Sequence, residues 1–432
     1  MSETKYILGY DLNDYVSQIS YYELNQQIPE ALPSGATEER LGIPTVLSKR
    51  KGVSQWEYGI NAQRAAALGN ASLVANMLSL ATTGAKLELE GEAYEAAQLL
   101  LLFVRRSLNL LSMLMTPEQV ELMVITVESL EGKLMDVVEM IASNLPIPRE
   151  RIILQTYEES IFYYMLHQPE ALWERDVAVF DYSGTGIKAY ALWMNTKTQP
   201  IVAFVDRTNL CNAPLPDSAT EREASRVSAE KMQQLDAFIL EQAREYFAGK
   251  NIGTVFLLGE GFEGGWCEQT LKYLCKANRV FQGRNLYSKG ACYAGHDKVF
   301  PVELNENYVF LGVDKLKFNL GVKVILKGEE EYVALADAGV NWYESDSEND
   351  FVLGEDKEIN LVITPLDGKD PQEVTVELNG IPDRPPRASR VRLAIEFNSE
   401  TSMILRVSDL GFGEFYPATD KTWEKIVDLS QA

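Results

Sequence analysis

The first part of the chain alternates short apolar runs with segments of helical spacing. Residues 5–23 predict two strands, and the largely apolar run Val120–Val127 predicts a buried one. Apolar positions three and four apart predict a helix over 130–145. Further strands are expected at 43–47 and 151–154, and further helices at 91–114 and 158–167. Strands that alternate with helices indicate an α/β architecture.

A second unit of the same kind is predicted from Arg175 onward. Strands are expected at 177–181, 187–195, 200–206 and 254–258, with a long amphipathic helix over 218–247 and a shorter helix over 267–276. The order of elements repeats that of the first unit, so the chain is expected to contain two related α/β lobes.

The pattern changes near Asn305, beyond which strands alternate with turns and strong helical periods are absent. Residues 391–397 and 403–407 keep a period of two around a short turn, which predicts an antiparallel hairpin with one buried face. The predicted domains are an α/β domain over 1–305, a linker over 306–320, a β-sandwich over 321–420 and a short C-terminal helix or tail over 421–432.

Composition narrows the classes of partner. The formal net charge is −23, from 63 acidic and 40 basic residues, and this argues against a nucleic-acid partner. Four cysteines without a C-x-x-C pair and two histidines argue against a zinc site or a disulfide framework. The start has no apolar secretory region, and polar residues interrupt the most apolar helix, so a cytoplasmic protein without a membrane span is expected.

Two segments carry the candidate chemistry. Tyr6–Asn13 and Val177–Gly186 are apolar runs that end in Asp11 and Asp181 and continue into tight turns. A buried strand delivers a carboxylate to its end, and the turn exposes backbone N–H groups there. Two such hairpins that face each other can hold a metal-bound phosphate chain. The alternative is that both aspartates serve only turn formation.

The order of segments resembles that of the seventy-kilodalton heat-shock chaperones, within the actin-like ATPase superfamily. Asp11 stands at the aspartate of that family's first phosphate loop, and Phe180–Gly186 resembles its second loop, D-L-G-G-G-T. Leu257–Gly261 is similar to its adenosine loop. Tyr58–Arg64 resembles a G-x-x-A-x-R segment, Val124–Val127 and Arg151–Gln155 resemble its "VITVP…RIINEP" stretch, and Ser288–Gly295 resembles its closing helix.

The β region carries a further part of the resemblance. Leu378–Pro382, with prolines at 385 and 386, resembles the L-x-G-I-P-x-x-P element that precedes a hairpin in the family's substrate-binding domain. Phe318–Val322 resembles its S-L-G-I segment, and Val309–Val313 stands where the family has its apolar linker. The alternative interpretation of Val309–Val313 is an ordinary strand.

The resemblance implies a two-lobed, actin-like (duplicated ribonuclease-H-like) nucleotide domain followed by an antiparallel β-sandwich. It implies ATP or ADP as ligand, Mg²⁺ held through water by Asp11 and Asp181, and catalytic roles for Asp11, Gln155 and Asp181. The implied nucleotide-binding positions are Asp11, Leu12, Asn13, Asp181, Ser183, Gly184, Thr185, Gly186, Gly259, Glu260 and Gly261.

Several departures change what the resemblance implies. Asn13, Asp14 and Tyr15 replace the small residues of the first loop, and Asp14 adds a carboxylate near the expected phosphate site. The family's catalytic lysine falls near Leu78, where this chain has no lysine. Gln155 replaces the catalytic glutamate, although an amide can also orient a water. A shortened second lobe and the lack of a helical lid are also expected.

The sequence therefore predicts a divergent, lidless, chaperone-like protein, bacterial in type, in which nucleotide binding is coupled to a peptide or protein site on the β domain. The alternative is a pseudo-ATPase interaction scaffold, and hydrolysis is expected to be slow or absent in either case. The predicted peptide pocket uses Tyr332, Val333 and Leu335, whose alternative role is core packing. Sugar and acetate kinases share the actin-like core but would leave the β region unexplained.

Overall fold

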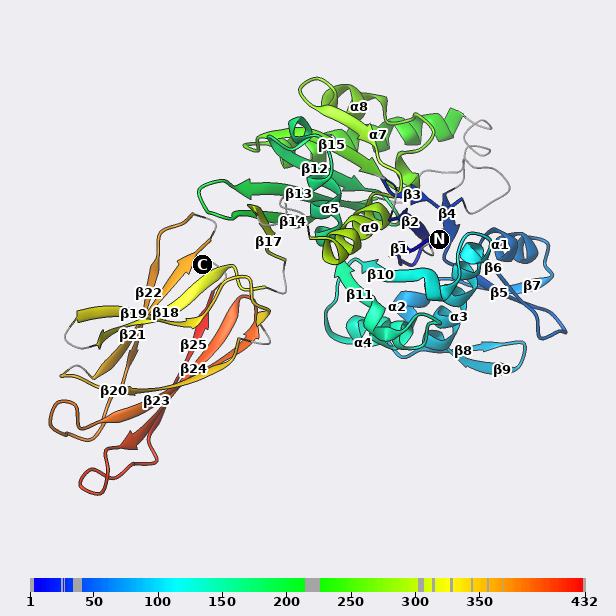
Figure 1. The fold of residues 1–432 in the computed structure, drawn as a ribbon. Coiled ribbons are helices and arrows are strands. Elements are labelled where there is room, and N and C mark those ends of the chain that lie inside the picture. The colour runs from blue at the N-terminus through cyan, green and yellow to red at the C-terminus, as the bar shows by residue number, and fades with distance from the viewer. Residues whose placement is uncertain are drawn as a thin grey trace. The chain divides into compact units, whose positions relative to one another are not determined.

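The computed structural model describes residues 4–24, 26, 28–33, 41–213, 226–301, 307–312, 315–326, 329–342, 345–355, 357–366 and 368–429. The fold is mixed α/β with several separate sheets (Figure 1). The chain divides into two compact units. The first comprises Met1–Trp193 and Val205–Asn305, and the second comprises Met194–Phe204 and Glu306–Ala432.

The first sheet of the first unit has the order β11-β10-β1-β2-β3, with β4 also paired to β2. The central strand β1 runs parallel to β10 on one side and antiparallel to β2 on the other. Strand β10 in turn runs parallel to β11. The strands are β1 (Tyr6–Asp11), β2 (Val16–Glu23), β3 (Glu30–Ala31), β4 (Gly42–Pro44), β10 (Val120–Val127) and β11 (Ile152–Thr156).

The second sheet has the order β16-β15-β12-β13-β14-β17, where β17 is Tyr308–Phe310, and its strands β16 to β13 repeat the arrangement of the first sheet. Its central strand β12 is antiparallel to β13 and parallel to β15, which is parallel to β16. Asp11 and Asp181 are the last residues of the two central strands. The strands are β12 (Asp176–Asp181), β13 (Gly186–Asn195), β14 (Ile201–Asn212), β15 (Ile252–Leu258) and β16 (Arg279–Gln282).

The helices of the first unit are α1 (Gly59–Ala67), α2 (Met77–Thr82), α3 (Ala96–Leu108), α4 (Gly132–Ser143), α5 (Tyr157–Leu166), α7 (Arg226–Phe247), α8 (Glu268–Leu274) and α9 (Leu286–Val299). Smaller sheets join β5 (Leu47–Arg50) to β6 (Trp56–Tyr58) and β7 (Ala71–Val74), and β8 (Lys86–Leu89) to β9 (Glu92–Glu95). Residues 218–225 of the predicted amphipathic helix lie outside the described residues.

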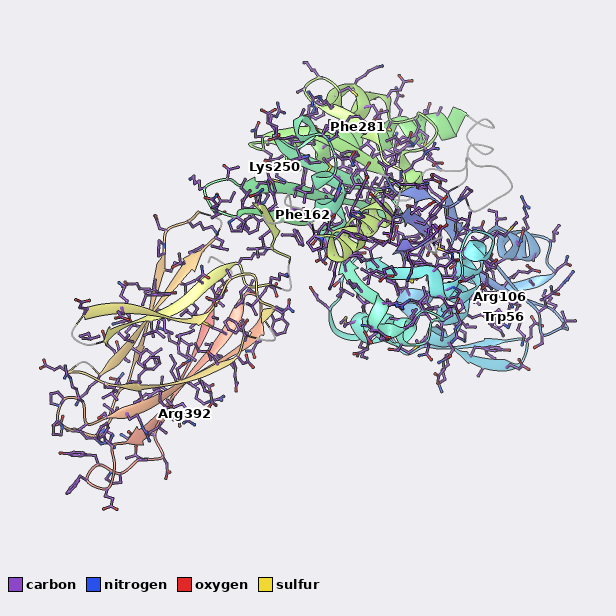
Figure 2. All side chains as sticks on the ribbon, in the orientation of Figure 1. Trp56, Arg106, Phe162, Lys250, Phe281 and Arg392 are labelled. Carbon is purple, nitrogen blue, oxygen red and sulfur yellow. The ribbon has the colours of Figure 1, made fainter. Side chains whose placement is uncertain are left out.

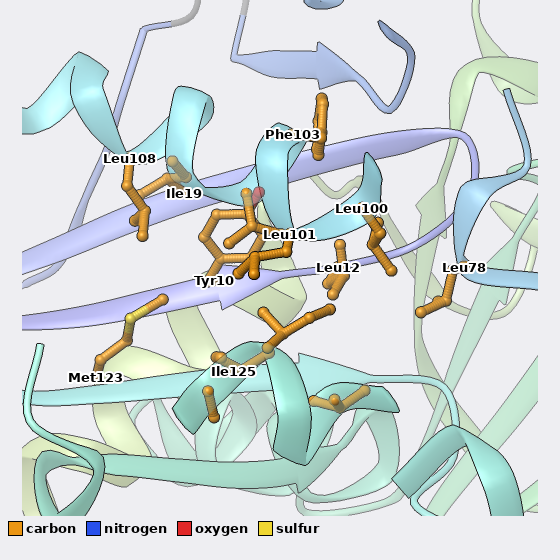
Figure 3. Packing of buried hydrophobic residues seen from close by; sticks show 14 of the residues in the cluster. Tyr10, Leu12, Ile19, Leu78, Leu100, Leu101, Phe103, Leu108, Met123 and Ile125 are labelled. Atoms are coloured by element: carbon orange, nitrogen blue, oxygen red, sulfur yellow. The ribbon is translucent and has the colours of Figure 1, made fainter. Parts of the chain in front are cut away.

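The two faces of β1 contribute to different hydrophobic clusters, as the period of two in a strand requires. Tyr10 and Leu12 pack with Leu100 and Phe103 of α3 (Figure 3). The Tyr10 hydroxyl also lies 2.7 Å from Ser107 Oγ on that helix. Ile7, on the other face of the strand, belongs to a cluster with Ala291, Cys292 and Tyr293 of α9. The central strand is therefore covered by a helix on each face.

The second unit contains two four-stranded antiparallel sheets, with the orders β19-β18-β21-β22 and β20-β23-β24-β25. Its strands are β18 (Phe318–Leu326), β19 (Glu329–Ala336), β20 (Ser347–Val352), β21 (Glu358–Pro365), β22 (Gln372–Glu377), β23 (Arg390–Ser399), β24 (Ser402–Gly411) and β25 (Thr422–Asp428). Both sheets contribute to one core of residues between Leu316 and Leu429. The predicted hairpin is confirmed as β23 and β24.

The predicted C-terminal helix is wrong, because Thr422–Asp428 forms the strand β25. The segment pairs antiparallel with β24, whose backbone groups would otherwise be left unpaired at the edge of the sheet. Val427 enters the core, and Trp423 packs against it. Pairing and burial therefore override the helical interpretation of this short segment.

Part of the segment predicted as a linker over 306–320 also has regular structure. Tyr308–Phe310 forms β17, which pairs in parallel with Ile201–Ala203 of β14 inside the second unit. The strand interpretation of Val309–Val313 therefore holds for Val309 and Phe310, whereas Leu311 and Gly312 lie outside the strand. Val313 lies outside the described residues, and Phe318–Leu320 already belongs to β18.

A buried ion pair organises one end of the second unit. Arg384 donates two hydrogen bonds to Asp409, at 2.6 and 2.8 Å, and a third to the Pro417 carbonyl at 2.9 Å. Asp409 also accepts from the Gly411 N–H and from Thr419. Every oxygen of the carboxylate is thus satisfied, and the bonds from Arg384 hold the pKa of Asp409 well below its usual range.

Replacing Arg384 with methionine is expected to destabilise the second unit by about 3–5 kcal/mol, because Asp409 would become an unpaired buried charge. Since its pKa is depressed, the contribution of Asp409 is present at neutral pH and is lost as pH falls below about 4. Urea unfolding at pH 7 and pH 3.5 measures both effects. The matched control is Arg392→Met (Figure 2), whose exposed pair with Asp350 should cost less than about 1 kcal/mol.

A fragment of residues 315–432 is expected to fold alone, because the hydrophobic cluster that both four-stranded sheets share lies within it. Circular dichroism and dispersed amide NMR signals would test this. The same fragment with Leu405→Asp should be unfolded, since the substitution places a charge in the core. A disordered spectrum of the unmodified fragment would mean that Met194–Phe204 is required for folding.

Candidate functional site

A cavity of about 1060 Å³ in the first unit brings together residues from both hairpins. Six of the predicted positions line it, namely Asp11, Asn13, Asp181, Ser183, Gly259 and Glu260. Residues 282–287, which lead into α9, line it as well, together with residues near α1 and α2. The sequence pattern thus located a real concavity at the ends of the two central strands, as expected for ligand sites in α/β sheets.

Two stacked tyrosines bind the two aspartates. The Tyr157 hydroxyl donates to Asp11 Oδ1 at 2.6 Å, and the Tyr287 hydroxyl donates to Asp181 Oδ2 at 3.0 Å. The tyrosine rings are parallel within 5°, with centroids 3.8 Å apart. Both carboxyl groups are therefore tied to one aromatic stack.

The starts of two helices place these tyrosines. Tyr157 is the first residue of α5, which begins directly after β11 and is capped by the Thr156 hydroxyl. Tyr287 is the second residue of α9, after Asn285, which has a left-handed backbone conformation (φ 59°). The side-chain amide of Asn285 is buried and has no hydrogen-bond partner among the described residues. Both tyrosines are buried.

The electrostatics of the two carboxyl groups are coupled. Burial, as the largest cause, and the nearby charge of Asp181 together raise the pKa of Asp11 to about 7, against the hydrogen bonds from Tyr157 and Asn13. Burial also raises the pKa of Asp181, opposed by hydrogen bonds from Ser183 and Tyr287. The pKa values of both tyrosines lie well above the usual value, mainly through burial, so both hydroxyls stay protonated donors.

The first turn is held by its own side chains. Asn13 Oδ1 accepts from the Tyr15 and Val16 N–H groups, each at 2.8 Å. Asp14 accepts from the Leu78 N–H at 2.7 Å and from the Ser79 N–H at 3.1 Å, at the beginning of α2. The carboxylate that was expected to repel a phosphate thus serves the N-terminus of a helix.

The second turn depends on glycine. A side chain at Gly184 (φ 153°) would overlap the ring of Tyr15, which comes from the first turn. Gly259 (φ 88°), which follows β15, lies against this turn, and a side chain there would overlap the backbone of Tyr182. Within the turn, the Ser183 hydroxyl donates to Asp181. The two hairpins are therefore in direct contact through Tyr15 and Gly184.

Several predicted nucleotide-binding positions do not line the cavity. Leu12 packs in the core, and its N–H donates to the Thr126 carbonyl at 3.0 Å. Gln155, predicted as a catalytic residue, is also absent from the lining: its side chain is buried and donates to Ser160 Oγ at 2.6 Å. The others are Gly184, Thr185, Gly186 and Gly261, which form the turns themselves.

The predicted peptide pocket is not formed by its three residues. Leu335 is buried in the core of the second unit, and Val333 packs against that core. Tyr332 points to the other face of β19, lies over Gly321 and is 48% exposed. Alternate residues of a strand face opposite sides, so the three cannot line one pocket. Lys327 and Gly328, which precede them in the sequence, lie outside the described residues.

The expected Mg²⁺ fits poorly with these contacts. Magnesium usually keeps several waters when it is held by one or two carboxylates, whereas both candidate carboxyl groups are buried and each already accepts from a tyrosine. Within the described parts of the chain, no group of three or more His, Cys, Asp or Glu side chains could hold a metal ion.

The described helices also include none long and apolar enough to cross a membrane.

Sequence reasoning missed the two tyrosines. Each follows a predicted strand or loop at a helix start, but neither belongs to a motif of the resemblance. The only signal was the presence of an aromatic residue in the first turn of each helix, and this pattern is common in buried helices. Their role depends on the packing of α5 against α9, which spacing along the chain does not show.

Two family descriptions match the chain. Residues 28–313 match "Family of unknown function (DUF5716) C-terminal", and residues 315–429 match "Domain of unknown function (DUF8552)". The two matches meet in the segment predicted as a linker. The comparison with curated proteins finds no match.

An NMR titration of the aspartate carboxyl carbons should place Asp11 near pH 7. Replacing Tyr157 with phenylalanine removes a hydrogen bond to the ionised form, so the midpoint should rise by on the order of one pH unit. In the unmodified protein, the raised pKa means that folded Asp11 binds its proton more tightly than Asp11 of the unfolded chain. The contribution of Asp11 to the free energy of unfolding therefore falls as pH rises from about 4 to 7.

The matched control is Tyr246→Phe, which removes a buried hydroxyl that has no hydrogen-bond partner in the described chain and does not contact Asp11. This variant should leave the midpoint of Asp11 unchanged. A midpoint near 4 in the unmodified protein would show that the Asp11 carboxyl is solvated rather than buried.

Proposed function

The chain belongs to the DUF5716 C-terminal family, and we propose that it is a divergent, heat-shock-type pseudo-ATPase that acts as an interaction scaffold. The main support for this proposal is a pair of hydrogen bonds: the hydroxyls of Tyr157 and Tyr287 donate to the two carboxyl groups at the strand ends in the cavity. These are the groups that the chaperone resemblance assigns to Mg²⁺ and phosphate. In this proposal the cleft is retained as part of the fold, and phosphoryl transfer is lost.

The actin-like part of the proposal is supported by the sheet topology. Each sheet has a central strand with an antiparallel neighbour on one side and two parallel strands on the other. Both central strands end in an aspartate, and both aspartates line one cavity. Such duplication is the arrangement expected of a two-lobed, ribonuclease-H-like domain.

The charge of the cavity also favours a pseudo-ATPase. Five carboxylic side chains line it, from Asp11, Asp14, Asp181, Glu260 and Glu263, and Arg284 is the one cationic side chain among the described lining residues. Phosphoryl transfer needs positive charge beside the transferred group. At the position expected for the family's lysine, the Leu78 backbone donates to Asp14 instead.

The second candidate is the nucleotide-coupled chaperone. It is favoured by the size of the cavity and by Gly259 and Glu260, which line it where the resemblance places an adenosine loop. In this alternative, ADP or ATP with Mg²⁺ would displace the tyrosine hydroxyls from the aspartates. In both candidate functions the β domain is the module that binds a partner, through a surface other than the predicted pocket.

We expect no ATP turnover by the full chain above that of a mock preparation, and no heat of binding with Mg²⁺–ATP at micromolar concentrations. Isothermal calorimetry and a phosphate-release assay measure the two quantities. The Tyr157→Phe/Tyr287→Phe double variant frees both carboxyl groups and should bind Mg²⁺–ATP more tightly than the unmodified protein.

Asp181→Ala serves as the control for a genuine site. Turnover by the unmodified chain that disappears in this variant would refute the pseudo-ATPase proposal. Binding without turnover that also disappears in Asp181→Ala would favour the nucleotide-coupled alternative.

A further inference from the structure

Both histidines of the chain contact one buried carboxyl group. His167 Nε2 lies 3.0 and 2.9 Å from the two oxygens of Asp297, and His296 Nδ1 lies 3.3 Å from one of them. The Asp297 side chain is 2% exposed, and the histidine side chains are 20% and 18% exposed. Protons can therefore reach the imidazoles, while their acceptor is shielded.

The contact joins two helices of different origin. His167 directly follows α5, which continues from β11 of the first sheet. Asp297 lies in the last turn of α9, which follows β16 of the second sheet. The helices pack side by side (Figure 1), and a side chain at Gly290 of α9 would overlap the Ser160 carbonyl of α5. The hydrogen bond between His167 and Asp297, at the C-terminal ends of α5 and α9, therefore connects segments that follow the two different sheets.

The surroundings of this contact are aromatic. The Tyr293 ring stacks on His167 with centroids 4.2 Å apart, and Tyr22 of β2 lies 4.6 Å from the His296 ring. The charge of Asp297 raises the pKa values of the Tyr22, Tyr163 and Tyr293 hydroxyls, in each case after burial as the larger cause. These tyrosines remain neutral, and aromatic faces stabilise a cation.

We propose that the His167–Asp297 contact is a proton-operated latch between α5 and α9 that tightens as pH falls. A neutral His167 donates one N–H to the carboxylate. A protonated His167 makes a charge-assisted bond, which is roughly twice as strong. Imidazole is the side chain that ordinarily changes charge between pH 5 and 8, and this sets the pH range of the test. His296 adds a longer contact to the same oxygen and is secondary.

Hydrogen exchange of the full chain at pH 5.5 and 7.5, corrected for intrinsic rates, tests the latch. Peptides covering α5 and α9 should exchange about tenfold more slowly at pH 5.5 in the unmodified protein. In His167→Gln, which keeps a donor but cannot be protonated, a large part of this difference should be lost. His296→Gln is the matched control and should retain most of it.

The comparison between variants removes other pH effects, because protonation of Asp11 contributes equally to the unmodified protein and to His167→Gln. Equal pH dependence in these two proteins would overturn the proposal, as would a larger loss in His296→Gln than in His167→Gln. The partly exposed position of His167 favours folding of the variant, so the test does not depend on substituting the buried Asp297.

Discussion

The close approach of α9 to the first sheet and to α5 is the constraint on which the rest of the first unit depends. A side chain at Gly9 of β1 would overlap the Ser288 carbonyl, and one at Gly290 would overlap the Ser160 carbonyl. The backbones of β1, α9 and α5 are therefore in direct contact at these two glycines. Ser20 and Ser288, whose hydroxyls lie 2.8 Å apart, add a buried hydrogen bond at the same place.

This packing accounts for the tyrosine stack. Tyr287 precedes Ser288, and Tyr157 is three residues before Ser160, so the two contact points fix the first turns of both helices. The rings are then parallel at van der Waals distance, and each hydroxyl reaches the aspartate of a different central strand. The stacked tyrosines therefore connect the ends of the two central strands through their hydrogen bonds to Asp11 and Asp181.

Much of the fold followed from the sequence, because apolar runs and a period of two report directly on burial. The central strands, their terminal aspartates and the β23–β24 hairpin were all predicted in this way. The failures share a different cause. Gln155, Leu12 and the strand β25 owe their states to partners distant in sequence, namely Ser160, Thr126 and β24. A local pattern contains no information about such partners.

The same distinction, between what a local pattern indicates and what distant partners determine, applies to the chemistry of the candidate site. The sequence located Asp11 and Asp181 but could not tell whether they face solvent, a metal or another side chain. Burial raises the pKa values of both groups, and in the structure each accepts a hydrogen bond from a buried tyrosine hydroxyl. In the proposed function, the two aspartates stabilise the strand ends, and the mainly acidic side chains of the cavity do not supply the positive charge that phosphoryl transfer needs. Retention of the aspartates is therefore weaker evidence for ATP hydrolysis than the identity of the groups that contact them.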